Sequence, residues 1–183
     1  MRFPLLLIVA ALLAFGAPAG ATQNDPQLQP LFARLQATAD PGEGEALQSA
    51  IWTVWTTTDD KEAARMMAIG IIAMGQGRLD DALSTFDALV EVAPDFAEAW
   101  NKRATVHYLM GNLEESVADI EKTLALEPRH FGALSGLGLI YQDVEKWDAA
   151  LRAFEAALKV NPHMPTVRAN IEALKKKSRD STR

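Results

Sequence analysis

Three prolines at a constant spacing constrain this chain more than any other feature of its sequence. Pro94, Pro128 and Pro162 follow one another at intervals of 34 residues. If each proline takes position 32 of a 34-residue unit, three units span residues 63–96, 97–130 and 131–164. Repetition at a period of this length is typical of stacked supersecondary units that share one continuous core. The chain is therefore expected to form a linear array.

Residue size also repeats within these units. Positions 8 and 20 are small, and positions 4 and 24 are large or branched. The small residues are Gly70, Ala104 and Gly138 at position 8 and Ala82, Ser116 and Ala150 at position 20; the large residues are Met66, Trp100 and Leu134 at position 4 and Phe86, Ile120 and Phe154 at position 24. Within each unit, apolar residues recur at intervals of three and four, as they do on the buried face of a helix. Each unit is expected to be a pair of closely packed antiparallel helices, with Trp100 buried between the first and second units.

The ends of the helices have their own signals. Gly77 and Gly111 occupy position 15, where the first helix of a unit must end in a residue of positive φ. In the third unit Glu145 and Lys146 replace this glycine. Asn112 and Glu115 have the spacing of a capping box for the second helix of the middle unit. The proline at position 32 ends each second helix because it has no amide hydrogen.

These residues resemble the tetratricopeptide repeat family. The segments "AEAWNKRATVHYLMGNLEESVADIEKTLALEPRH" and "FGALSGLGLIYQDVEKWDAALRAFEAALKVNPHM" match its helix–turn–helix pattern almost throughout. The segment "AARMMAIGIIAMGQGRLDDALSTFDALVEVAPDF" departs from it at Ala73, where an aromatic residue is usual. The resemblance implies an all-α, right-handed solenoid of antiparallel helix pairs. It implies a scaffold for protein partners rather than one particular function.

The segments that flank the repeats are expected to close the array. Residues 22–62 are expected to form a degenerate helical hairpin and a linker, with a turn at Pro41–Gly42. This hairpin would cover the exposed apolar face of the first repeat, with Trp52 and Trp55 as core residues; stacking on a ligand is the alternative role for the two tryptophans. Asp59 or Asp60 is placed to cap the next helix.

Residues 165–183 are expected to form a capping helix and a basic tail. Pro165 is suited to the first position of the helix, and Val167, Ile171 and Leu174 share its apolar face. The tail "KKKSRDSTR" is explained either by basic residues at a helix C-terminus or by weak contact with an anionic membrane or an acidic partner.

The first 21 residues have the form of a secretory signal peptide. Arg2 precedes an apolar run from Leu5 to Phe15, and Ala19 and Ala21 provide small residues before a cleavage site. The run is too short to cross a bilayer core, which takes about 20 residues. We expect an exported, periplasmic protein that begins near Thr22; an uncleaved N-terminal membrane anchor is the alternative.

The composition argues against several classes of function. The net charge is −6, which disfavours a nucleic-acid partner, and the absence of cysteine excludes disulfides and thiolate metal sites. His107, His130 and His163 lack the spacing of metal ligands, and the last two are expected in exposed turns. The sequence contains no phosphate-binding loop and no nucleophile elbow. We expect no enzyme, no cofactor and no small-molecule substrate.

The resemblance implies a concave binding groove lined by positions 2, 5, 9 and 12 of the first helices. In this sequence the implied residues are Met67, Ile71, Met74, Glu98, Asn101, Thr105, Tyr108, Ser135, Leu139 and Gln142. The family's clamp for a C-terminal carboxylate needs lysine and asparagine at such positions, whereas Met67 and Ile71 stand here, so this clamp is rejected. Arg103 at position 7 either pairs with Asp119 or extends to solvent.

Two functions remain open at this point. The chain is either an adaptor that binds a peptide or partner helix in the groove, or a structural subunit of an envelope assembly, self-associating or permanently docked. In the second case the groove would not be free. The N-terminal hairpin itself is a further possible occupant of the groove.

Overall fold

The computed structural model describes residues 22–181. The expected signal peptide, residues 1–21, and the last two residues of the basic tail lie outside the described residues. The described chain is all-helical, with one short 3₁₀ turn, η1 (Thr22–Asn24), and nine α-helices. These are α1 (Leu28–Ala37), α2 (Pro41–Thr56), α3 (Lys61–Gly75), α4 (Leu79–Val92), α5 (Ala97–Met110), α6 (Leu113–Leu126), α7 (Phe131–Asp143), α8 (Trp147–Val160) and α9 (Pro165–Ser181).

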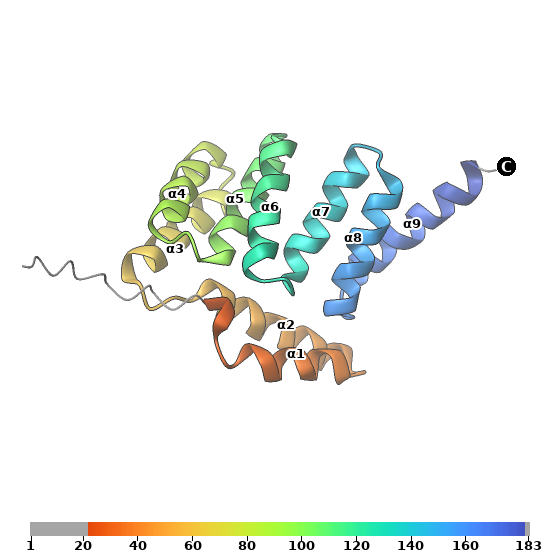
Figure 1. Ribbon diagram of the computed structural model, residues 1–183, viewed down its shortest axis with the longest axis horizontal. Helices are drawn as coiled ribbons and strands as arrows, with labels where there is room; N and C mark the ends of the chain where they lie inside the picture. The colour runs from red at the N-terminus through yellow and green to blue at the C-terminus, as the bar shows by residue number, and fades with distance from the viewer. Residues whose placement is uncertain (1–21, 182–183) are drawn as a thin grey trace, which may run out of the picture.

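The pairs α3–α4, α5–α6 and α7–α8 are the three predicted units, and they stand in a row (Figure 1). Within a pair the helices approach closely because position 8 is small. A Cβ atom added to Gly70 would lie 2.5 Å from the ring of Phe86, and one added to Gly138 would lie 2.5 Å from that of Phe154. Both phenylalanines are fully buried. The expected close packing of the two helices of a unit is confirmed at these two sites.

The expected turns are largely confirmed. Gly77 and Gly111 adopt φ values of 71° and 82°, and Glu145 keeps the same left-handed conformation with φ 59°. The capping box at Asn112 was a wrong expectation, because its side chain makes no capping hydrogen bond. The backbone N–H of Asn112 already donates to the carbonyl of His107, so it is not available to the Glu115 side chain.

Helix α9 closes the C-terminal end of the row as expected. Val167, Ile171 and Leu174 are buried in one cluster with Phe154 of α8. Of the basic residues near the helix end, Lys177 contacts the fold, since its ammonium lies 3.6 Å from the ring centre of Trp147. No helix among the described residues is long and apolar enough to cross a membrane.

The N-terminal segment forms the expected hairpin, but its turn differs from the expectation. Pro41 is the first residue of α2, and the Asp40 carboxylate caps that helix by accepting from the Gly42 N–H. The turn therefore precedes Pro41, because the fixed φ of proline suits the first helical position. Asp60 caps α3 by accepting from the N–H groups of Glu62 and Ala63, which confirms one of the two predicted caps.

The position of the hairpin corrects the sequence-based expectation. Helices α1 and α2 do not cover the first repeat; they lie across the lower ends of the later repeat helices (Figure 1). The hairpin joins its core to the second and third repeats, because the Trp55 ring stacks on that of His130, with ring centres 4.1 Å apart. The first repeat does not receive this cover, since Ile69 and Ile72 of α3 remain 45% and 55% exposed.

Candidate functional site

The hairpin contacts all three segments that end the repeats. Gln23 donates to the carbonyl of Asp95, which follows the first repeat's proline, at 2.8 Å. Arg129, at the same position of the second repeat, donates to the Gln29 side chain at 3.2 Å. Asn161, beside the third repeat's proline, donates to the Gln48 side chain at 2.6 Å. The segment that ends each repeat thus gives the N-terminal segment one anchor point.

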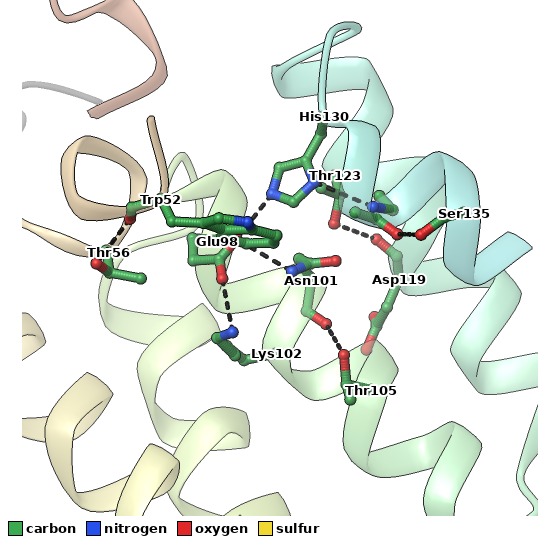
Figure 2. A network of polar contacts seen from close by, with 12 residues as sticks. Trp52, Thr56, Glu98, Asn101, Lys102, Thr105, Asp119, Thr123, His130 and Ser135 are labelled. Carbon is green, nitrogen blue, oxygen red and sulfur yellow. Dashed lines mark hydrogen bonds and ion pairs between the residues drawn. The ribbon is translucent and has the colours of Figure 1, made fainter. Parts of the chain in front are cut away.

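A buried polar cluster lies beneath the hairpin (Figure 2). The Glu98 side chain is fully buried, and it contacts His130 Nε2 at 2.7 Å, Asn101 Nδ2 at 3.0 Å and Lys102 Nζ at 2.9 Å. His130 Nδ1 accepts from the Ala133 N–H at 3.1 Å and so caps α7. Because Nδ1 is an acceptor, Nε2 carries the ring proton and donates it to the Glu98 carboxylate.

The cluster sets the ionisation of Glu98. Burial alone would raise the pKa of this carboxyl group, because a charge is poorly solvated away from water. The hydrogen bond from His130 and the charge of Lys102 outweigh the effect of burial, so the pKa of Glu98 lies below its ordinary value. The Lys102 ammonium also lies 5.1 Å from the centre of the Trp52 ring. A carboxylate inside the fold therefore links α2, α5 and α7.

Three of the predicted groove residues are buried, so the expectation that they line an open groove was wrong. Glu98 and Asn101 do not face an open groove: they are 0% and 6% exposed, because the hairpin covers positions 2 and 5 of the second repeat. Met67 is only 2% exposed, because its flexible side chain turns into the core of the first repeat beside Phe86.

The two histidines at the ends of repeats were expected in exposed turns, and this expectation was wrong. His130 is fully buried beneath the hairpin tryptophans. His163 is partly buried, and its ring packs so closely on α2 that a Cβ at Gly44 would lie 2.4 Å from it. Sequence reasoning missed His130 because its partner Glu98 lies 32 residues away, on a different helix. No group of three histidines or carboxylates that suits a metal occurs among the described residues.

The other half of the predicted groove remains accessible. We call the positions 9 and 12 of the three repeats the open strip. Its members are Ile71 and Met74, Thr105 and Tyr108, and Leu139 and Gln142. Ile71 is 39% exposed and the other five are half-buried. The Tyr108 hydroxyl donates to the Asp143 carboxylate at 2.7 Å, and this bond raises the pKa of Tyr108. The bond fixes the second repeat to the third along the strip.

The open strip ends in a cavity at the third repeat. Ser135 and Leu139 line this cavity of about 250 Å³ together with Gln48 of α2 and with Val167 and Asn170 of α9. A larger cavity of about 780 Å³ shares Gln48 and continues between the hairpin and the start of α9. The residues contributed by α2 and α9 were not predicted, because the repeat pattern does not place the flanking segments.

Arg103 forms the ion pair that was one of its two expected roles. Its Nε and Nη2 atoms donate to the two carboxylate oxygens of Asp119 at 2.8 and 2.7 Å, and Nη1 donates to Asp87 at 2.9 Å. The bonds to Asp119 are the main reason that the pKa of Arg103 is raised. The arginine therefore connects three helices, α4, α5 and α6.

Trp100 is less buried than expected. It packs on the core of the first repeat but remains half-exposed. Its indole N–H donates to the Pro94 carbonyl at 2.9 Å, and the guanidinium of Arg103 lies 4.9 Å from the ring centre. The indole is therefore held along the edge of the interface rather than inside it.

Comparison with known proteins agrees with this architecture. Two profiles described as tetratricopeptide repeat match residues 67–130 and 131–164. A TPR repeat-containing protein of Rhizobium etli is 33% identical over 151 residues, which make up 82% of this chain and 74% of that protein. The mouse DnaJ homolog subfamily C member 3 is 33% identical over 101 residues, but the chain spans only 20% of its length.

Solved structures share the fold at low sequence identity. The TPR domain of Sgt2 from Aspergillus fumigatus is 22% identical, with a TM-score of 0.62 over 67% of this chain and 82% of that one. The first TPR of Spaghetti (RPAP3), bound to the HSP90 peptide SRMEEVD, is 18% identical, with a TM-score of 0.62 over 65% of this chain and 94% of that one. This chain belongs to the tetratricopeptide repeat family.

Proposed function

We propose that this chain is a non-enzymatic adaptor that binds an extended peptide along the open strip. The observation that carries the proposal is the accessibility of positions 9 and 12 in all three repeats, next to positions 2 and 5 that the hairpin covers in the second repeat. Because the repeats are in register, each of them offers positions 9 and 12 to a ligand. Contacts at such regular intervals suit a ligand in extended conformation. The first TPR of Spaghetti (RPAP3), which shares the fold, is solved with a bound HSP90 peptide, and this supports a peptide as the class of ligand.

The chemistry of the strip favours an apolar peptide over an acidic one. Ile71 and Met74 make one end apolar, and Thr105 and Gln142 supply hydrogen-bonding groups for a peptide backbone. The strip contains no lysine or arginine, and the Asp143 carboxylate lies beside it. The cavity next to Leu139 is large enough for one apolar side chain. We infer a peptide that carries an apolar residue for this cavity.

The proposed setting is the bacterial periplasm or cell envelope. The signal-peptide form of residues 1–21 supports it. Mass spectrometry of the native protein checks it: a chain that begins at or near Thr22 is expected, and an intact Met1 in the membrane fraction would favour the anchor.

Selection from a random peptide library, followed by titration of the selected peptides, tests the groove. Leu139→Arg places a charge at the mouth of the cavity and is expected to weaken binding at least tenfold. Glu121→Arg places the same charge on an exposed site of α6 and is expected to leave binding unchanged. Equal binding by both variants would move the interaction away from the open strip.

A further inference from the structure

The open strip leads to two cavities that share part of their lining. We call the cavity of about 250 Å³ beside Leu139 the inner cavity and the one of about 780 Å³ the outer cavity. Gln48 of α2 lines both, and so do His163, Met164 and Pro165 at the start of α9. The outer cavity has the volume of a pocket for a drug-sized ligand, which is more than one side chain fills. A peptide with one residue in the inner cavity therefore has room to continue into the outer one.

Hydrogen bonds fix the orientation of the Gln48 amide. The fully buried Asn161 accepts from the His163 backbone N–H with its Oδ1 at 2.9 Å, so its Nδ2 is the atom that donates to Gln48, at 2.6 Å. The acceptor in this bond must be the carbonyl oxygen of Gln48. Within the described part of the chain, nothing accepts from Nε2, the other end of the amide. Gln48 therefore has two N–H donors available to a ligand where the cavities meet.

Arg168 of α9 supplies further donors. It lines the outer cavity, and its Nη2 atom donates to the Pro162 carbonyl at 2.6 Å, which holds the guanidinium at the wall. Its other N–H groups have no acceptor among the residues that the structure describes, and no carboxylate of these residues pairs with it. A guanidinium with free N–H groups matches the planar, two-oxygen geometry of a carboxylate.

Two carboxylates of α2 lie near the outer cavity. Glu43 is already paired with Arg34 at 2.6 Å. Glu45 lines the outer cavity, and it is exposed and has no ion-pair partner in the described chain. The outer cavity thus offers one unpaired positive charge, from α9, and one unpaired negative charge, from α2.

The donors of Gln48 decide between the two charges. A cationic group of a ligand would be attracted by Glu45 alone, since Gln48 Nε2 offers only donors and Arg168 repels a cation. A carboxylate accepts from Gln48 and Arg168 together, and only Glu45 repels it. The outer cavity therefore favours an acidic group.

We propose that the outer cavity is a second subsite of the peptide groove, in which Gln48 and Arg168 bind an aspartate or glutamate side chain of the ligand. This inference rests on the proposed function, in which an apolar residue of the same peptide fills the inner cavity. Alternate side chains of an extended chain point to the same side, so the acidic residue is expected about two positions from the apolar one. The volume of the outer cavity leaves room for the chain to continue, so the carboxylate belongs to a side chain and not to the C-terminus.

The peptides that a random library yields against this chain test the subsite. They are expected to share an acidic residue at a constant distance from the apolar one. Arg168→Gln is expected to lower their affinity about fivefold, as for an ion pair that water partly screens. Lys176→Gln removes the same charge from an exposed site of α9 that lines neither cavity, and it is expected to leave the affinity unchanged.

Two variants of α2 test the contribution of the hairpin. Gln48→Glu keeps an oxygen for Asn161 but replaces the N–H donors with a negative charge, so it is expected to weaken an acidic peptide without unfolding the chain. Glu45→Gln removes the repelling charge and is expected to strengthen the same peptide. Thermal unfolding of each variant shows whether the hairpin stays in place.

Changes in the peptide identify the group that is bound. Replacing its acidic residue by the matching amide is expected to weaken binding to the wild-type chain and to leave binding to Arg168→Gln unchanged. If amidation of the peptide C-terminus has this effect instead, the subsite binds a chain end and the proposal is wrong. Selected peptides that respond to Leu139→Arg but lack an acidic residue and do not respond to Arg168→Gln would overturn the subsite and leave the groove intact. Failure to select any peptide, or peptides that do not respond to Leu139→Arg, would overturn both.

Discussion

Glu98 of the second repeat and His130 at the end of the same repeat are joined by a 2.7 Å contact between two side chains that are both excluded from solvent. The two residues are 32 positions apart, and α5 and α6 lie between them, so the contact fixes the two ends of one repeat against each other. The Trp55 ring stacked on His130 connects the hairpin to the same pair. We therefore expect the cohesion of the hairpin with the repeats to depend on the charge of one buried carboxylate.

Replacing Glu98 tests this dependence. Glu98→Gln keeps the size of the side chain but removes the charge that Lys102 and His130 stabilise, so the free energy of unfolding at pH 7 is expected to fall by about 1–3 kcal/mol. Glu121→Gln, an exposed site on α6, is the matched control and is expected to change it by no more than about 0.5 kcal/mol. Urea denaturation measures both.

The pH dependence of the Glu98→Gln effect has a definite sign. The pKa of Glu98 is lower in the folded chain than the ordinary value of 4.5, so the ionised form stabilises the fold. This stabilisation is fully present above about pH 5.5 and is lost as the pH falls through 4.5 and then through the lower folded pKa. The difference in stability between wild type and variant should shrink in the same window. A difference that grows on acidification would show that burial, rather than Lys102 and His130, controls the ionisation of Glu98.

Asp119 and Asp87 bind the same arginine but should contribute unequally to stability. Asp119 is nearly buried and receives two hydrogen bonds from Arg103, so Asp119→Asn is expected to cost about 1.5–3 kcal/mol. The Asp87 side chain is 52% exposed, and Asp87→Asn is expected to cost less than about 1 kcal/mol because water screens the pair. Thermal and urea unfolding of both variants checks the order. Equal losses would contradict the assignment of Asp119 as the principal partner.

The sequence predicted the repeats well because the evidence for them is local and repeated. Gly70 and Phe86 belong to one helix pair, and the same relation recurs in Gly138 and Phe154. The hairpin was predicted to form but was misplaced, since its position depends on contacts between residues far apart in the chain. Trp55 of α2 meets His130, which precedes α7, and no period relates the two.

The candidate site was predicted only in part for the same reason. Family resemblance places positions 2, 5, 9 and 12 on the concave face, but it does not indicate what lies over them. In this chain α2 covers Glu98 and Asn101, and α2 and α9 add Gln48 and Asn170 to the end of the open strip. The contribution of such flanking helices follows from their packing and has no signal in the repeat pattern.

Two glycines of α3 provide a matched test of helix packing. Gly70→Ala places a methyl group 2.5 Å from the fully buried ring of Phe86, and the overpacking is expected to cost about 1–3 kcal/mol. Gly75→Ala places the same group in open space at the end of the helix, so it is expected to be neutral or to stabilise by up to about 1 kcal/mol. A Gly70→Ala protein of unchanged stability would mean that α3 and α4 are farther apart than the structure shows.

Asn101 and Thr105, one turn apart on α5, separate the covered half of the concave face from the open half. Asn101 is 6% exposed and donates to the Glu98 carboxylate, so Asn101→Ala is expected to cost about 1–3 kcal/mol by removing a hydrogen bond to a buried charge. Thr105 is half-buried, and its hydroxyl donates to the Asn101 carbonyl of the same helix. Thr105→Ala should therefore change the free energy of unfolding by less than about 0.5 kcal/mol, since alanine also favours the helix.

The affinity for a peptide should be affected in the opposite order, more by Thr105→Ala than by Asn101→Ala. Thr105→Ala removes a group of the open strip from a stable fold and is expected to lower the affinity for a selected peptide by a few-fold. Calorimetry at a temperature where both variants remain folded measures this affinity. Asn101→Ala is expected to leave the affinity nearly unchanged at that temperature, because the side chain lies under the hairpin. A larger loss of peptide affinity in Asn101→Ala than in Thr105→Ala, with both variants folded, would contradict this expectation. The ligand would then have to displace the hairpin, and the groove would extend over the covered half.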